Sequence, residues 1–122
     1  MSKLNFDKTI TLAFGVSDRK ASINWYEKHL GFSLIFDVPE IGWAEMTTNV
    51  DGVSVGFGDT EEIKPGGCVP VLGVTDIDQA RQVLEDQGVR FDGETITHDG
   101  MVKLATFYDR DDNAWMLSQT LG

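Results

Sequence analysis

One short pattern in this chain matches the motif of a serine nucleophile. Residues 52–56 read GVSVG, which fits G-x-S-x-G, but that motif needs a strand, a sharp turn and then a helix in a much larger protein. Here Val53, Val55 and Phe57 alternate with small residues, which predicts a plain strand, and a linker follows it. We therefore do not predict a serine nucleophile.

A second possible source of chemistry is the single cysteine with one of two histidines. Cys68 and either His29 or His98 could form a nucleophile and its base. A lone cysteine that opens an apolar strand usually serves packing, and His29 lies beside the expected end of a helix, where its charge is favourable. We therefore predict no catalytic residue. One cysteine also excludes an internal disulfide, as expected in a reducing cytoplasm.

Composition bounds the possible partners. The chain has 122 residues with 41% hydrophobic content, which suits one globular domain. Twenty acidic residues against ten basic residues give a formal net charge of −10, which repels nucleic acid and attracts cationic small molecules. No apolar run approaches the roughly 20 residues that span a bilayer. We predict a cytoplasmic protein with no nucleic-acid or membrane partner.

The chain contains an internal repeat. Residues 13–34 align with residues 71–91 at an offset of 57 to 60, and GVSD at 15–18 matches GVTD at 73–76. In each copy an alternating strand is followed by an aspartate suited to cap a helix, Asp18 or Asp76. Gly31 and Gly88 suit the left-handed residue that ends each helix. Pro70 predicts that the strand around it begins there or lies at a sheet edge.

Each copy then continues with three further strand candidates. They are 33–38, 43–48 and 53–58 in the first copy, and 94–98, 102–108 and 114–119 in the second. The predicted unit is therefore βαβββ, used twice. We expect a single domain over 1–122, with module one at about 5–58, a linker at about 59–67 and module two at about 68–119.

The motifs VSD…SINWYEKHLGF and FYDRDDN, in this doubled order, resemble the vicinal oxygen chelate superfamily. That family includes glyoxalase I (lactoylglutathione lyase), bleomycin-resistance proteins and extradiol dioxygenases. Arg110 and Asp112 stand where the family's closing turn has proline and glycine. The resemblance implies an α+β fold in which two modules form a curved mixed sheet, with helices on its convex face and a ligand on its concave face. It also implies a homodimer.

Metal-dependent members of that family place His, Glu or Gln at four concave positions. Here the resemblance maps those positions onto Thr11, Gly56, Val69 and Met116, and none of these is a usual ligand for a divalent metal. We predict no metal and no cofactor. Met116 is expected to line the cavity as a flexible thioether, unless side chains simply fill the cleft.

Glu45 is the most reactive group expected on the concave face. Alternation along 43–48 turns Trp43 and Glu45 toward that face, and the repeat offset turns Lys103 and Phe107 the same way. A carboxylate beside aromatic rings suits a cationic or hydrogen-bonding ligand, and it could act as a general base if desolvated. The competing interpretation is a solvated Glu–Lys pair at the sheet rim.

These observations favour a metal-free binding protein that sequesters a small aromatic or cationic ligand. The alternatives are a glyoxalase- or dioxygenase-like lyase, isomerase or oxygenase, and a domain that only dimerises. The predicted ligand-binding residues are Thr11, Trp43, Glu45, Val69, Lys103 and Met116.

Overall fold

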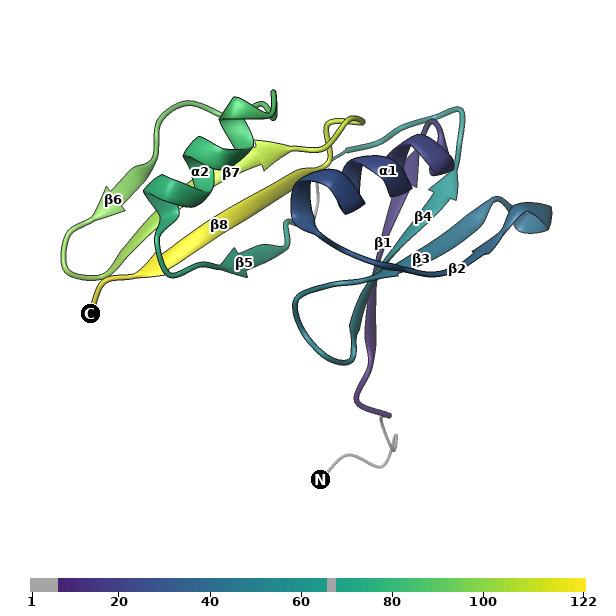
Figure 1. The fold of residues 1–122 in the computed structure, drawn as a ribbon, viewed down its shortest axis with the longest axis horizontal. Coiled ribbons are helices and arrows are strands. Elements are labelled where there is room, and N and C mark those ends of the chain that lie inside the picture. The colour runs from purple at the N-terminus through teal and green to yellow at the C-terminus, as the bar shows by residue number, and fades with distance from the viewer. Residues whose placement is uncertain (1–6, 66–67) are drawn as a thin grey trace. The chain divides into compact units, whose positions relative to one another are not determined.

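The computed structural model describes residues 7–65 and 68–122. The chain forms two compact units, Met1–Ile63 (unit 1) and Lys64–Gly122 (unit 2), and each has the order βαβββ (Figure 1). This confirms the predicted α+β fold of two repeated modules. Residues 5 and 6 of the predicted first module and residues 66 and 67 of the predicted linker lie outside the described residues. That the two units make one domain stays a prediction.

Unit 1 is a four-stranded mixed sheet with one α-helix. Its strands lie in the order β1-β4-β3-β2, with β1 parallel to β4 and the other pairs antiparallel. The elements are β1 (Ile10–Val16), α1 (Arg19–Leu30), β2 (Leu34–Val38), the 3₁₀ turn η1 (Pro39–Ile41), β3 (Trp43–Thr47) and β4 (Val53–Asp59).

Unit 2 repeats this topology with a shorter first strand. Its order is β5-β8-β7-β6, and β5 is parallel to β8. The elements are β5 (Val71–Gly73), α2 (Ile77–Asp86), β6 (Ile96–His98), β7 (Val102–Tyr108) and β8 (Ala114–Thr120). As predicted, β5 lies at an edge of its sheet and begins directly after Pro70, which has no N–H to donate. Neither helix of the described chain has the length and apolar character that a membrane crossing needs.

Both helices begin and end at the predicted residues. Asp18 accepts a hydrogen bond from the Ala21 N–H at 3.2 Å, and Asp76 accepts one from the Gln79 N–H at 3.1 Å. Each is an N-cap that satisfies an otherwise free helical donor. Gly31 has φ 71° and ends α1 in the left-handed conformation that glycine adopts without a steric penalty.

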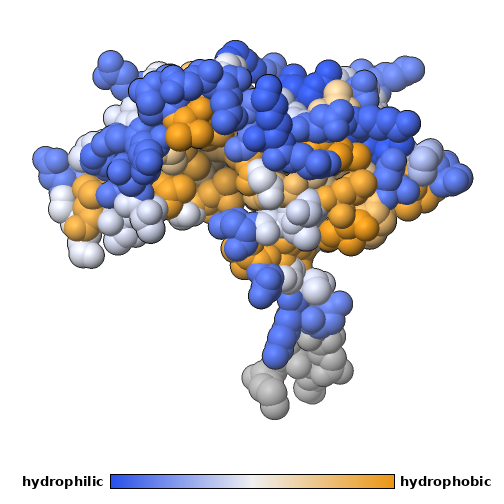
Figure 2. Space-filling model, in the orientation of Figure 1, coloured by the Kyte–Doolittle hydropathy of each residue, from blue (hydrophilic) through white to orange (hydrophobic). Residues whose placement is uncertain are grey.

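One face of each sheet forms a core with its helix. In unit 1, Phe57 of β4 packs on Tyr26 of α1 with 4.7 Å between ring centroids, and neither residue is exposed. In unit 2, Trp115 is fully buried and Leu117 nearly so, on the α2 side of β8. Not all apolar residues are covered: Leu34, Ile35 and Phe36 of the edge strand β2 remain 41–51% exposed, and hydrophobic surface is visible over this part of unit 1 (Figure 2).

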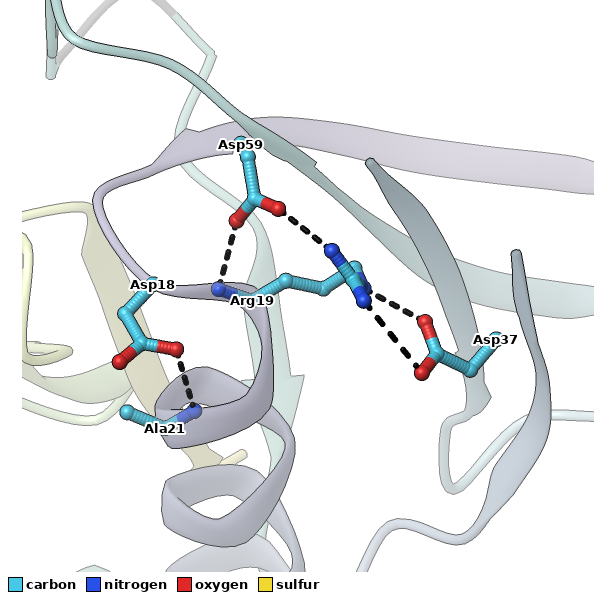
Figure 3. A network of polar contacts seen from close by, with 5 residues as sticks. All are labelled: Asp18, Arg19, Ala21, Asp37 and Asp59. Carbon is cyan, nitrogen blue, oxygen red and sulfur yellow. Dashed lines mark hydrogen bonds and ion pairs between the residues drawn. The ribbon is translucent and has the colours of Figure 1, made fainter. Parts of the chain in front are cut away.

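A buried arginine joins three elements of unit 1 (Figure 3). Arg19, the first residue of α1, is 7% exposed, and its guanidinium contacts Asp37 of β2 and Asp59 of β4, each at 2.5 Å. Asp59 also accepts the backbone N–H of Arg19 at 2.7 Å. The Asp37 hydrogen bond is the main reason that the pKa of Arg19 is raised above its usual range. This network fixes the start of α1 to two strands.

Hydrogen bonds to Asp109 hold the turn between β7 and β8. Asp109 is buried and accepts hydrogen bonds from the Asp111 N–H, the Asn113 N–H and the Asn113 side-chain amide at 2.8–3.0 Å. Asp112 has φ 66° at the position where the family has glycine, a conformation that aspartate tolerates better than most residues. The Asp109 network therefore holds the hairpin without the usual proline and glycine.

Candidate functional site

The face of the unit 1 sheet that points away from α1 carries three rows of side chains across β1, β4 and β3. Ala44 and Met46 of β3 are fully buried on the α1 side, so Trp43, Glu45 and Thr47 point the other way, as predicted. We call this the open face of unit 1. The strand register defines its rows as Thr11–Ser54–Thr47, Ala13–Gly56–Glu45 and Gly15–Gly58–Trp43.

The Trp43 indole lies across two glycines of β4. A Cβ atom added to Gly56 would come within 2.2 Å of Cζ2 and 2.4 Å of Cη2 of the ring, and one added to Gly58 would lie 3.5 Å from Cε3. Glycine at position 56 is therefore a steric requirement for this ring position. Trp43 is half-buried, so part of the indole surface remains available for contact.

A carboxylate and a pair of hydroxyl groups neighbour the indole. The Trp43 Nε1–H donates to Glu45 Oε1 at 3.2 Å, which fixes both side chains. In the adjacent row, Thr11 Oγ1 and Ser54 Oγ share a hydrogen bond at 2.9 Å. Aromatic, anionic and hydroxyl groups thus lie in successive rows, about 7 Å apart along each strand.

A pocket of about 360 Å³ opens over the hydroxyl end of this face. Its walls come from β1 and the residue before it, from β2 and β3, from the start of β4 and from the turn between β3 and β4. Its lining combines hydroxyl and carboxylate groups with apolar surface and consists of Thr9, Thr11, Ile35, Glu45, Thr47, Thr48, Val50, Asp51, Gly52, Val53 and Ser54. The pocket is therefore suited to a polar ligand group, beside an indole suited to a flat one.

The corresponding face of unit 2 carries the thioether of Met116. Met116 lies between the buried residues Trp115 and Leu117, so it points away from α2, as predicted. Its neighbours in register are Val71 of β5 and Thr106 of β7. Met116 occupies the place in β8 that Gly56 occupies in β4, between two buried residues of the last strand.

The prediction for Lys103 and Phe107 is wrong. Lys103 Nζ contacts Asp78 of α2 at 3.0 Å, and Phe107 is fully buried, so both point to the helix side. The repeat offset is 60 between β4 and β8 but 61 between the buried pairs Ala44–Met46 and Ala105–Phe107. A change of one residue turns every side chain of a strand to the other face.

The prediction that Val69 lies within a strand is also wrong. β5 spans only Val71–Gly73, so Val69 and Cys68 precede it in a segment without regular structure. Val69 is half-buried, and Cys68 is exposed. The predicted ligand contacts of Thr11, Trp43, Glu45, Val69 and Met116 stay predictions, of which the first three lie on one face.

The residues at the four metal-ligand positions do not fit a divalent cation. Thr11, Gly56, Val69 and Met116 supply no imidazole, carboxylate or thiolate, and the Trp43 ring covers Gly56. Within 7–65 and 68–122, no group of three or more His, Cys, Asp or Glu side chains is arranged to hold a metal ion. Glu45 is the register partner of Gly56, but one of its oxygens is bonded to the Trp43 indole.

Several residues of the pocket were not singled out in the sequence. Ser54 was considered only within the nucleophile motif, and Asp51 and Thr48 lie in a turn that alternation does not orient. Pairing the predicted strands would have identified Ser54, because a parallel β1–β4 register places it beside Thr11. No local signal could have found the stacking of Trp43 on Gly56, which depends on antiparallel pairing between β3 and β4.

The chain belongs to the Glyoxalase/Bleomycin resistance protein/Dioxygenase superfamily, whose family model matches residues 9–117. No curated protein matches it in sequence.

Solved structures share the fold. TnmS3, described as an antibiotic binding protein from Streptomyces sp. CB03234, aligns with a TM-score of 0.76 and 24% identity, covering 95% of this chain and 98% of that chain. A superfamily member from Sphaerobacter thermophilus aligns with a TM-score of 0.76 and 24% identity over 91% and 95% of the two chains. TioX from Micromonospora sp. ML1 aligns with a TM-score of 0.73 and 17% identity over 93% and 98%.

Proposed function

We propose that this protein binds a small organic molecule without a metal, using the open face of unit 1, and that sequestration rather than catalysis is its role. The observation that carries the proposal is the Trp43 indole, held flat on Gly56 and Gly58 by backbone shape and by its hydrogen bond to Glu45. A ring fixed in this way binds a planar group with little loss of conformational freedom. The likeness in fold to an antibiotic binding protein supports this proposal.

We also propose that Met116 of unit 2 contacts the ligand. A thioether on the uncovered face of unit 2 can adjust to the shape of an apolar ligand. Thr11 contributes a hydroxyl group to the pocket of unit 1. We leave Lys103 out of the proposed site because its Nζ pairs with Asp78 on the helix side.

Tryptophan fluorescence tests the proposal directly. The chain has three tryptophans: Trp115 is fully buried, Trp25 is on α1, and Trp43 is on the open face. Titration with planar two- and three-ring aromatic compounds is expected to quench the wild-type emission with saturation. The variant Trp43→Phe is expected to lose most of that quenching, whereas the control Trp25→Phe retains it.

Two results would contradict the proposal. The first is an absence of saturable quenching, and of any binding heat, across the whole aromatic panel. The second is stoichiometric Zn, Ni, Fe or Mn that survives dialysis, which would favour the glyoxalase- or dioxygenase-like enzyme instead.

We also propose a cytoplasmic homodimer. The exposed apolar residues of the edge strand β2 offer a surface that a second copy of the chain can cover. Light scattering coupled to size-exclusion chromatography is expected to give the mass of two chains, and a single-chain mass at micromolar concentration would exclude a stable dimer.

A further inference from the structure

The pocket of unit 1 presents more hydrogen-bond acceptors than donors. Thr11 and Ser54 share one hydroxyl proton in their mutual bond, which leaves one hydroxyl proton between them. The Thr47 hydroxyl oxygen already accepts the Ser33 N–H at 3.0 Å, and the Thr48 hydroxyl lies 2.8 Å from the Val53 carbonyl. The Thr47 proton and one proton of the Thr11–Ser54 pair remain as donors, and they are outnumbered by the acceptors of the walls once the two carboxylates described next are included.

Two carboxylates add negative charge to the same walls. Glu45 uses Oε1 for the Trp43 indole, and its Oε2 bonds to none of the residues that the structure describes. Asp51, in the β3–β4 turn, is exposed and has no hydrogen-bond partner within the described ranges. A ligand group that approaches them meets acceptors that can be satisfied only by a donor.

Among residues 7–65, no basic side chain belongs to the lining of this pocket. Lys8 lines an adjoining, mostly apolar hollow of about 450 Å³ that shares Thr9, Gly52 and Val53 with it. The Arg19 guanidinium is already paired with Asp37 and Asp59. Neither Lys8 nor Arg19 therefore forms an ion pair with Glu45 or Asp51 in the described part of unit 1.

We propose that this pocket takes the protonated amine of the ligand, an inference that rests on the binding function proposed above. An ammonium group has three donors and no acceptor, which matches the Glu45, Asp51 and hydroxyl oxygens of the walls. The ligand class is therefore an aromatic amine whose ring contacts Trp43 and whose ammonium lies toward the hydroxyl row.

Three matched probes test this inference: 1-naphthylmethylamine, 1-naphthylmethanol and 1-naphthoate. In calorimetric titrations of the full chain at low salt, the amine is expected to bind about tenfold more tightly than the alcohol, because a charge-assisted hydrogen bond exceeds a neutral one. The carboxylate is expected to bind more weakly than the alcohol. Added salt should reduce the affinity for the amine and leave that for the alcohol nearly unchanged.

Charge-removing variants locate the effect. Glu45→Gln keeps an amide oxygen for the Trp43 Nε1–H, so the indole position is preserved while the charge is lost. This variant, Asp51→Asn, or both are expected to reduce the preference for the amine over the alcohol to less than threefold. The control Glu40→Gln removes the same charge from the exposed turn η1 and is expected to keep the preference.

The outcomes separate the two proposals. Equal affinity for amine and alcohol, or a preference retained in both pocket variants, overturns the assignment of an amine but leaves aromatic binding intact. Failure of all three probes to bind contradicts the binding function itself.

Discussion

In both units the first N–H of the helix donates to a side chain near the end of the last strand, but the two acceptors differ in charge. In unit 1 the Arg19 N–H donates to the Asp59 carboxylate at 2.7 Å, and in unit 2 the Ile77 N–H donates to the Gln119 amide oxygen at 2.8 Å. Arg19 then pairs with Asp37 as well, whereas the Ile77 side chain is simply buried. The same backbone hydrogen bond at the start of the helix therefore occurs with a charged first residue in unit 1 and with an apolar first residue in unit 2.

The sheet faces that point away from the helices also differ between the two units. Unit 1 has hydroxyl groups, Glu45 and an indole over glycines. The corresponding rows of unit 2 also contain hydroxyl residues (Thr106, Ser118 and Tyr108), but Val71, Met116 and Leu104 lie beside them. Both copies therefore have a largely apolar core against the helix, and the opposite face has an indole and a carboxylate in unit 1 but a thioether in unit 2. This is expected if the core determines folding and the uncovered faces determine what is bound.

The largest effect should come from breaking the ionic helix start. Arg19→Met leaves the half-buried Asp37 and the exposed Asp59 without their cation, and it removes the charge-assisted hydrogen bonds of a buried guanidinium, which is destabilising. We expect the midpoint of thermal unfolding to fall by roughly 10 °C. In unit 2, Gln119→Ala removes one neutral hydrogen bond and should lower the midpoint by less than half as much. Equal losses would show that the charges of Arg19 add nothing.

The next largest effect should come from filling the space under the indole. Gly56→Ala places a methyl group 2.2 Å from the Trp43 ring, so the ring must move, at a cost of about 2 kcal/mol for overpacking. Chemical denaturation measures the cost, and a shift of the tryptophan emission reports the movement. Gly73→Ala is the control, because a methyl group there meets no atom within 4 Å. An unshifted emission in Gly56→Ala would contradict the stacking.

A smaller effect of opposite sign is expected at Ser22. Its hydroxyl group is buried on α1 with no hydrogen-bond partner among the described residues, and Ala80 is the equivalent residue of α2. Ser22→Ala should therefore raise the free energy of unfolding by about 1 kcal/mol. The reverse change, Ala80→Ser, should lower it slightly. Loss of stability in Ser22→Ala would mean that the hydroxyl is satisfied in solution.

The smallest effect concerns pH. Burial, followed by the charge of Asp92 and a hydrogen bond to it, raises the pKa of Tyr108 above its usual value, with Arg90 opposing the shift. The folded protein keeps a proton that the unfolded chain releases near pH 10, so this contribution to stability is complete below about pH 10 and is lost as pH rises through the raised pKa. Ultraviolet titration should find a lower pKa for Tyr108 in Asp92→Asn. An unchanged titration would exclude the Asp92 contribution.

Most of the fold could be predicted from the sequence because its signals are local. Strand alternation, the Asp18 and Asp76 caps and the glycines that follow the helices are each encoded within a few residues. The site was less predictable. Lys103 was assigned to the wrong face because the offset between the two copies changes by one residue, and alternation converts that small error into a complete reversal.

Buried polar groups were also beyond the reach of sequence patterns. Arg19 reads as an ordinary charged residue of the first helical turn, and only pairing of β2 and β4 with the helix brings Asp37 and Asp59 to it. The position of the Trp43 ring over Gly56 depends in the same way on the register between β3 and β4. To predict such features one must know which segments of the chain are neighbours in space. The periodicity of the sequence does not give that information.

The indole over Gly56 and Gly58 also constrains how this chain can change during evolution. A histidine or glutamate introduced at position 56 by one mutation would place its side chain in a volume that the aromatic ring already fills. A ligand side chain at position 56 therefore requires a smaller residue at position 43, and with it the loss of the hydrogen bond to Glu45. Positions 43 and 56 are expected to vary together among relatives, with a bulky aromatic residue at one only where the other lacks a side chain.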